Sequence, residues 1–192
     1  MTEDVSFTGV PERIEVADVI VRRFTPADLP ALVAAVNVSL EELRPWMAWA
    51  QSPATVDDYE ERDWIGEGDR QWRAGTGFNY GIFATSGEFL GGVGFHVRNG
   101  PGVLEIGYWL RSDQQGRGLM TAVAGALTQA ATTVPDVTRV EIHCDPANHR
   151  SAAIPQRLGY ELREVREVPQ EAPGQTGKLQ IWAIEVTEVA VS

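Results

Sequence analysis

Apolar residues recur with helical spacing in the first third of the chain, after a strand-like beginning. Residues 19–24 are rich in β-branched side chains and predict a first strand, whereas residues 1–15 show no sustained period and predict an N-terminal arm. Three hydroxyl residues, Thr25, Ser39 and Thr55, are each followed by a carboxylate three positions later. This spacing is a helix-capping signal. These signals predict three helices, and the last is expected to end near the glycines at 66–68.

The middle of the chain has the alternating pattern of strands. Residues 80–84 and 89–97 flank a Thr-Ser-Gly-Glu turn and predict a hairpin, and residues 103–110 predict a third antiparallel strand after a glycine-rich turn. Successive side chains of a strand point to opposite faces, so Glu105 and Trp109 are expected to share one face of the sheet.

The last third returns to helical spacing and then alternates strands with helices. The pattern predicts a long helix after residue 118, a short helix ending near residue 159, and three strands, at residues 139–144, 160–165 and 178–185. This order of elements predicts one mixed sheet in an α/β or α+β domain. Neither a repeat nor a linker divides the chain, so residues 1–192 are expected to form a single domain.

The composition restricts the compartment and the class of partner. The one cysteine cannot form an internal disulfide, and no apolar run approaches the length of a membrane span, so a soluble cytoplasmic protein without a membrane partner is expected. A formal net charge of -11 argues against binding to nucleic acid, because such proteins neutralise phosphates with basic stripes. The acidic balance either attracts a cationic substrate or only keeps the protein in solution.

Two glycines separated by one residue, Gly116 and Gly118, stand between a predicted strand and the long predicted helix. A glycine-rich turn at a helix N-terminus directs several backbone N–H groups towards one point, where they can bind an anion. A lone glycine pair is weak evidence, since glycines also end strands and begin turns. The motifs around the loop decide whether the signal is specific.

Those motifs resemble the GNAT family of N-acetyltransferases. They are residues 105–110 (Glu-Ile-Gly-Tyr-Trp-Leu), residues 116–121 (Gly-Arg-Gly-Leu-Met-Thr), and Asn148-x-x-Ser151 followed by Arg-Leu-Gly-Tyr at residues 157–160. Within the family they look like the RimJ/RimL-type branch, which acetylates ribosomal-protein N-termini and other amines. The resemblance covers essentially residues 19–185 and is strongest over residues 104–160. It implies a mixed, mostly antiparallel sheet of about seven strands with helices on both faces.

The resemblance implies acetyl-coenzyme A as the cofactor. The glycine loop would hold its pyrophosphate, two splayed parallel strands would hold its pantetheine arm, and a strand N–H near Trp109 or Leu110 would polarise the thioester carbonyl. The residues implied in cofactor binding are Trp109, Leu110, Gln115, Gly116, Arg117, Gly118, Leu119, Met120, Thr121, Asn148 and Ser151. The family usually has glycine or alanine at the position of Met120, and methionine there is familiar in the RimL-like branch.

The acid that protonates the leaving thiolate departs from the family pattern. Many GNAT enzymes use a tyrosine seven residues after the asparagine, but that position is Pro155, which cannot donate a proton. Ser151 matches a RimL-like serine that faces the coenzyme sulfur, where its hydroxyl would hydrogen-bond the sulfur or relay a proton from water. Alternatively, the Ser151 hydroxyl only begins a helix.

Removal of a proton from the attacking amine needs a base, for which the sequence offers several candidates. Glu105 is the first, because family members often carry a carboxylate in this strand, and Glu141 with His143 on the same face of the next strand is the second. His96 and His149 are further candidates. The resemblance implies direct transfer without a covalent enzyme intermediate. No spacing in the sequence isolates a metal site or a nucleophilic triad.

The resemblance implies an N-acetyltransferase acting on a protein or peptide N-terminal amine. Two alternatives stay open: transfer to a small amine such as a polyamine, amino acid or drug, and acyl-coenzyme A binding without catalysis. The early helices and the connection at residues 166–177 are expected to form the acceptor pocket. Candidate wall residues are Trp46, Trp49 and Tyr80, although aromatic residues at such spacings are more often part of a core. A homodimer is expected, because dimers are common among such domains.

Overall fold

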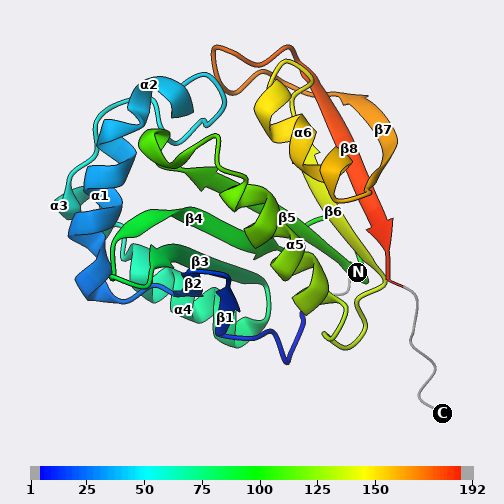
Figure 1. Cartoon of the computed structure of the whole chain (residues 1–192), viewed down its shortest axis with the longest axis horizontal. Helices are drawn as coiled ribbons and strands as arrows, with labels where there is room; N and C mark the ends of the chain where they lie inside the picture. The colour runs from blue at the N-terminus through cyan, green and yellow to red at the C-terminus, as the bar shows by residue number, and fades with distance from the viewer. Residues whose placement is uncertain (1–4, 187–192) are drawn as a thin grey trace.

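One sheet of eight strands runs through the computed structural model, which describes residues 5–186 (Figure 1). The strands lie in the order β1-β2-β3-β4-β5-β6-β8-β7. Their bounds are β1 Arg13–Val16, β2 Val19–Arg23, β3 Gly77–Ala84, β4 Phe89–His96, β5 Val103–Leu110, β6 Arg139–Cys144, β7 Glu161–Glu167 and β8 Lys178–Glu185. The β5–β6 pair is parallel and the other neighbouring pairs are antiparallel, which confirms the predicted mixed, mostly antiparallel sheet.

Strand β1 lies within the segment predicted to be an arm, so that prediction is wrong for residues 13–15. The strand pairs with β2 at the edge of the sheet, and its four residues alternate between exposed and half-buried. The polar and apolar residues alternate in the same way, but over only four positions, which is too short a stretch to show a sustained period. Upstream, Phe7 and Val10 are buried in the core, and the Phe7 N–H donates to the Gly75 carbonyl at 2.9 Å. The start of the predicted arm, residues 1–4, lies outside the described residues.

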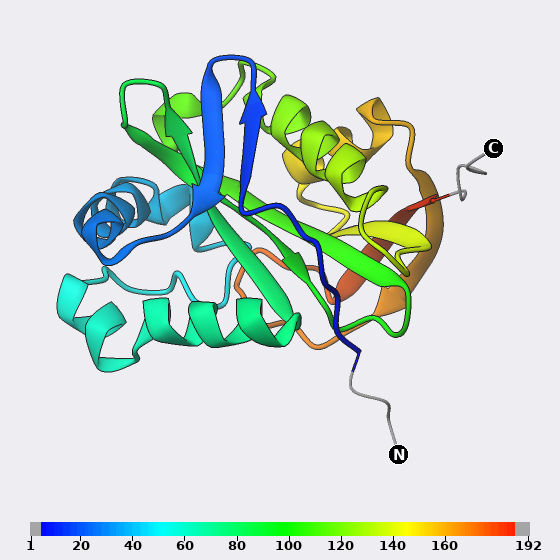
Figure 2. The same cartoon turned by 90° about the horizontal axis from the view of Figure 1, so that it is seen from below.

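Helices cover both faces of the sheet, as predicted (Figures 1 and 2). α5 and α6 lie on one face, and α1 to α4 lie on the other. Their bounds are α1 Leu29–Val38, α2 Leu40–Leu43, α3 Val56–Glu61, α4 Trp64–Ala74, α5 Leu119–Ala131 and α6 His149–Arg157. Within residues 5–186 none of these helices is long and apolar enough to cross a membrane.

The three predicted capping signals have different outcomes. Thr25 and Thr55 form capping boxes, in which the threonine N–H donates to the aspartate three residues later at 2.7 Å. The Ser39 hydroxyl caps no helix, so that prediction is wrong. It accepts a hydrogen bond from the Ser112 N–H at 2.9 Å and thereby ties the α1–α2 junction to the segment after β5. This long-range contact takes the place of the local one.

The third predicted helix consists of two helices, and it does not end at residues 66–68. Asp63 separates α3 from α4 with a left-handed φ of 47°, and its carboxylate occupies the place that a Cβ of Gly66 would take. α4 then continues to Ala74 and ends at Gly75, whose φ is 71°. Glycine at position 66 therefore makes room for the Asp63 carboxylate rather than ending a helix.

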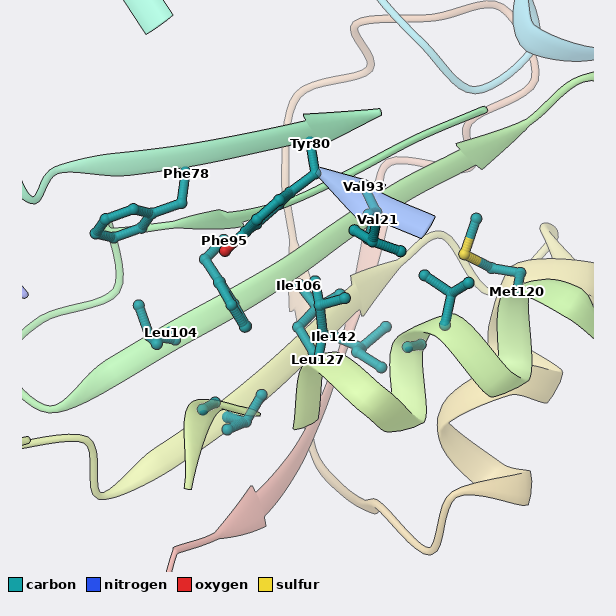
Figure 3. Packing of buried hydrophobic residues seen from close by; sticks show 14 of the residues in the cluster. Val21, Phe78, Tyr80, Val93, Phe95, Leu104, Ile106, Met120, Leu127 and Ile142 are labelled. Carbon is teal, nitrogen blue, oxygen red and sulfur yellow. The ribbon is translucent and has the colours of Figure 1, made fainter. Parts of the chain in front are cut away.

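The face beneath α5 forms the main hydrophobic core (Figure 3). β3, β4 and β5 each contribute alternate residues, among them Phe78, Phe95 and Ile106, and α5 contributes Leu127. Tyr80 is fully buried there, and its hydroxyl donates to the Pro11 carbonyl at 2.8 Å. Strand alternation places the Tyr80 side chain in the core, so the prediction that it lines an acceptor pocket is wrong.

Candidate active site

The parallel strands β5 and β6 separate along their length. They pair at three positions, and the last pair is Glu105 with Glu141. Beyond it, β5 still pairs with β4 as far as Leu110, while β6 pairs with β8. The separation of the two strands is thus confirmed. The edge of β5 away from β4 has no strand partner beyond Glu105 among residues 5–186. We call the space beside this edge the opening, where an extended ligand can add as a strand does.

The backbone of β5 points alternate N–H groups into this opening. The Arg111 N–H, just after the strand, donates to the Leu90 carbonyl on β4 at 2.9 Å. The N–H groups of a strand point alternately to its two edges. The Trp109 N–H, two residues before Arg111, therefore also points to β4. The N–H groups of Tyr108 and Leu110 therefore face the opening. Of the two residues predicted to polarise a carbonyl, Leu110 has the suitable N–H.

The glycine loop ends at the N-terminus of α5, which no side chain of residues 5–186 caps. Gly116 and Gly118 have φ of 80° and 76°, the left-handed region that glycine adopts without strain, and nothing lies within 4 Å of their Cβ positions. The N–H groups of Leu119 and the next two residues open the helix and can donate to an anion, which the helix dipole also attracts. This concavity fits the pyrophosphate that the resemblance implies.

The side chains of the loop are held in other contacts. The Met120 side chain is buried in the core (Figure 3), so only its backbone is available to a cofactor. Arg117 donates to the amide oxygen of Gln114 at 2.9 Å. Gln115 accepts a hydrogen bond from Arg150 of α6 at 2.6 Å, which ties the loop to the neighbouring helix. The backbone therefore supplies the anion donors of this loop.

Helix α6 begins beside the opening, and Asn148 caps it. Its Oδ1 accepts the Ser151 N–H at 3.2 Å, so the asparagine side chain is the N-cap. The Ser151 hydroxyl donates to the Tyr108 hydroxyl at 3.3 Å. The alternative in which the Ser151 hydroxyl begins the helix is wrong, because the Asn148 amide oxygen fills that role.

Pro155 lies inside α6 and changes its hydrogen bonding. A proline has no N–H, so the carbonyl four residues earlier, that of Ser151, receives no helical hydrogen bond from position 155. The Tyr108 hydroxyl donates to this carbonyl at 3.1 Å. Burial raises the pKa of Tyr108, which keeps the phenol protonated. Tyr108 thus fastens α6 to the open part of β5.

Sequence reasoning missed Tyr108 because the residue alternates onto the core face of its strand, where an aromatic side chain needs no functional explanation. The available signal was Pro155, since a proline four residues after Ser151 predicts a free carbonyl. The sequence could not show which donor would reach that carbonyl.

The opposite face of the sheet holds two rings over glycines of β4 and β5. The Trp109 indole lies over Gly92, where a Cβ would be 2.5 Å from the indole Nε1. The His96 imidazole lies over Gly107, where a Cβ would be 2.6 Å from Nε2. Trp49 is 50% exposed, and its ring centroid lies 6.0 Å from that of Trp109. Trp49 and Trp109 together form an aromatic wall on this face.

Two loops meet across the carboxyl ends of β5 and β6. The Gly174 N–H donates to the Pro45 carbonyl at 2.9 Å, and the Gln175 side chain donates to the Trp46 carbonyl at 3.1 Å. Asp145, which follows β6, anchors the same β7–β8 loop. We call the contact of Pro45 and Trp46 with Gly174 and Gln175 the bridge. It joins the two segments that were expected to form the acceptor pocket, near the top of Figure 1.

The two carboxylates predicted as bases are held in polar contacts. Glu105 is 3% exposed and accepts hydrogen bonds from Arg98 and Asn99, each at 2.8 Å. Burial raises the pKa of Glu105, but these hydrogen bonds and the nearby charges of Arg98 and His143 outweigh the burial and leave the pKa below its ordinary value. Glu141 lies 2.8 Å from His143 Nε2 and lines a polar cavity of about 510 Å³. The Glu105 carboxylate, held as an anion in this way, is a weak base.

The chain belongs to the acetyltransferase (GNAT) domain family, whose model matches residues 18–161. The protein is an N-acetyltransferase that depends on acetyl-coenzyme A. Among curated proteins it is similar to "Putative ribosomal N-acetyltransferase YdaF" of Bacillus subtilis (strain 168). The two are 27% identical over 146 residues, which cover 74% of this chain and 77% of the relative.

Solved structures with the same fold include two complexes, one with coenzyme A and one with a coenzyme A disulfide. One is RimL, a ribosomal L7/L12 alpha-N-protein acetyltransferase in complex with coenzyme A; its TM-score is 0.81 at 24% identity, over 91% of this chain and 98% of that chain. The other is RimJ of Mycobacterium smegmatis in complex with a coenzyme A disulfide; its TM-score is 0.80 at 21% identity, over 98% of this chain and 93% of that chain. At these identities the two structures show that this chain has the same fold.

Proposed function

We propose that the protein acetylates the N-terminal amine of a protein or peptide. The names of its relatives support this acceptor, since YdaF is named for ribosomal N-acetylation and RimL for the α-amine of L7/L12. The observation that carries the chemistry is the opening between β5 and β6, which has the uncapped N-terminus of α5 at one side and Ser151 at the other. Cofactor and acceptor would meet in this opening.

The backbone would hold acetyl-coenzyme A, which supplies the activated acetyl group as a thioester. The N–H groups of Leu119, Met120 and Thr121 would bind the pyrophosphate. The free edge of β5 would pair with the pantetheine arm, and the Leu110 N–H would polarise the thioester carbonyl. Asn148 orders the first turn of α6 beside it.

Ser151 would hydrogen-bond the leaving sulfur. The Ser151 hydroxyl already lies next to the open part of β5, where it donates to the Tyr108 hydroxyl at 3.3 Å. The Tyr108 hydroxyl in turn donates to the Ser151 carbonyl at 3.1 Å. A serine hydroxyl is a poor acid, so it would pass a proton from water to the thiolate rather than ionise itself. Tyr108 is a positioning residue in this scheme.

A panel of acceptors tests the proposed function. Peptides with a free N-terminus, the same peptides with a blocked N-terminus, and small amines are each incubated with acetyl-coenzyme A, and free thiol is measured. We expect kcat/KM for free N-terminal peptides to exceed that for small amines by about 10-fold or more, with the acetyl group located on the α-amine by mass spectrometry. Preference for a small amine, or binding of acetyl-coenzyme A without turnover, would favour one of the alternative functions.

Two further properties belong to the same proposal. A cytoplasmic location is proposed from the lone cysteine, Cys144, whose pKa is raised to about 11 by burial, which keeps the thiol unreactive. A homodimer is proposed from the resemblance to the family. Sedimentation velocity at several protein concentrations checks the oligomeric state.

A further inference from the structure

His96 has an unengaged imidazole, among the described residues, on the face of the sheet that also carries the Trp109 indole. The ring lies over Gly107 of β5, in the space that a side chain there would fill. Within residues 5–186 the imidazole has no side-chain hydrogen bond or ion pair, and it is partly exposed. His143, by contrast, is bound to Glu141 at 2.8 Å. The nitrogen atoms of His96 are therefore available to a ligand.

The position of His96 relative to the opening fits a group that acts on the acceptor. Gly107 is the second residue of β5 past the last pair with β6, so the ring lies where the opening begins. Gly94, the register partner of Gly107, also lacks a side chain. The Asn79 amide oxygen of β3 lies 2.9 Å from the place of a Gly94 Cβ, so the side chains of His96 and Asn79 cover the two glycines. Ser151 contacts the Tyr108 side chain on the other face of the same strand.

The surroundings of His96 keep the imidazole neutral. Burial lowers the pKa of His96; Glu105 of β5 raises it, while Arg98 after β4 and His143 of β6 lower it. α4 faces the neighbouring Gly77 with the neutral side chain of Gln71. A neutral imidazole near pH 7 can accept a proton.

We propose that His96 is the general base of acetyl transfer. This assignment rests on the function proposed above. The neutral amine nitrogen forms a bond to the thioester carbon, and its surplus proton passes through water to the His96 imidazole, because Gly107 lies three residues before Leu110 on β5. The carbon–sulfur bond breaks, its electron pair goes to sulfur, and the sulfur takes a proton from a water molecule through Ser151. His96 then gives its proton to the hydroxide that this water leaves, so the products are the acetylated amine and a free thiol.

The pH dependence of kcat/KM for an N-terminal peptide tests this role in the wild type and in His96→Gln. We expect kcat/KM to fall by about 100-fold or more in the variant. On the acid side of the profile, log(kcat/KM) rises with pH with a slope of about 2 in the wild type, because the amine and His96 must both lose a proton. The slope is about 1 in the variant, because only the amine then has to lose one. His143→Gln is the matched histidine control and keeps the slope of about 2. An unchanged rate and slope in His96→Gln, or loss of the slope in His143→Gln, would overturn the proposal.

Folding is checked by the Tm and by the affinity of His96→Gln for acetyl-coenzyme A, both of which should match the wild type. His96→Asn replaces the glutamine variant should that variant not fold. NMR titration of the wild type reports the pKa of His96 directly, and a value at or above the ordinary value of about 6.5 contradicts the proposal. Wild-type protein that acetylates no amine would overturn the function itself, whereas an active wild type with an unchanged variant overturns only the assignment of the base.

Discussion

The Tyr108 hydroxyl donates to the carbonyl oxygen of Ser151 at 3.1 Å, and the Ser151 hydroxyl donates back to Tyr108 at 3.3 Å. The carbonyl can take part because Pro155 provides no N–H for it. A proline at the position where many family members have a tyrosine therefore allows a tyrosine from β5 to hold the serine. Two predictions follow for this contact, one for the phenol and one for the hydroxyl.

Tyr108→Phe should leave the Ser151 carbonyl without a donor. We expect the free energy of unfolding to fall by about 1–2 kcal/mol and kcat to fall by about 10-fold, with little change in the KM for acetyl-coenzyme A. Pro155→Ala restores an N–H to the same carbonyl, so it should stabilise the Tyr108→Phe protein more than the wild type, by about 1 kcal/mol. Urea unfolding of the four proteins measures this coupling. Additive changes would show that the Tyr108 hydrogen bond does not depend on Pro155.

Ser151→Ala should lower kcat while the helix remains capped. Asn148 accepts the backbone N–H of residue 151, and alanine retains that N–H. We expect a fall in kcat of about 10-fold or more with a change in stability below about 1 kcal/mol. Free-thiol release and thermal melting measure the two effects. Full turnover with every accepted amine would remove Ser151 from the mechanism.

Gly118→Ala should weaken the binding of acetyl-coenzyme A. A Cβ at a φ of 76° strains the backbone and would reach into the concavity at the start of α5. We expect Kd to rise by about 10-fold in calorimetry and stability to fall by about 1–2 kcal/mol. Gly87→Ala is the matched control, because Gly87 has a φ of 90°, open space at its Cβ position and a place in the distant β3–β4 turn. Gly87→Ala should lower the stability by a similar amount without changing the Kd for acetyl-coenzyme A. Equal losses of affinity in Gly87→Ala and Gly118→Ala would contradict the assignment of the loop to the cofactor.

Glu105→Gln should destabilise the fold in a way that depends on pH. The pKa of Glu105 is lowered in the folded protein, so its ionised form stabilises the fold above the unfolded-state pKa of about 4.3. That stabilisation is lost as the pH falls through the folded-state value. We expect the variant to be about 2 kcal/mol less stable near pH 7, with the difference shrinking below about pH 4.

Urea unfolding across this pH range measures the Glu105 effect. Glu15→Gln is a suitable control, because Glu15 pairs with Arg13 at 3.0 Å but is 74% exposed. An exposed pair should contribute less than about 1 kcal/mol at any pH. A similar, pH-independent loss in both variants would contradict the role given to the buried carboxylate.

Local patterns predicted the elements whose causes are local. The capping boxes at Thr25 and Thr55, the hairpin and the glycine loop each depend on residues within a few positions of one another, and each is present. The failures depend on distant partners. Ser39 bonds to Ser112 rather than to its own helix, and Tyr80 alternates into the core, because tertiary packing outweighs a local cap or an aromatic pattern.

The candidate site divides in the same way. The motif around Gly118 indicated the cofactor, because backbone conformation and a helix terminus can be inferred from short stretches of sequence. The base could not be chosen among the candidates, since the choice depends on which side chains are already engaged. Glu105 is engaged by Arg98, whereas His96 shows no such partner in the described part of the chain. That difference exists only after the strands have been placed side by side.

The bridge between Pro45 and Gly174 limits the shape of an acceptor. Two loops that hydrogen-bond to each other make a closed connection over the ends of β5 and β6. An acceptor that reaches the opening beneath this connection would have to be threaded, with its end first. A flexible tail that begins with a free α-amine can do this, whereas a lysine within a folded surface cannot. The connection between two loops would thus select termini by topology, before any side chain of the acceptor is recognised.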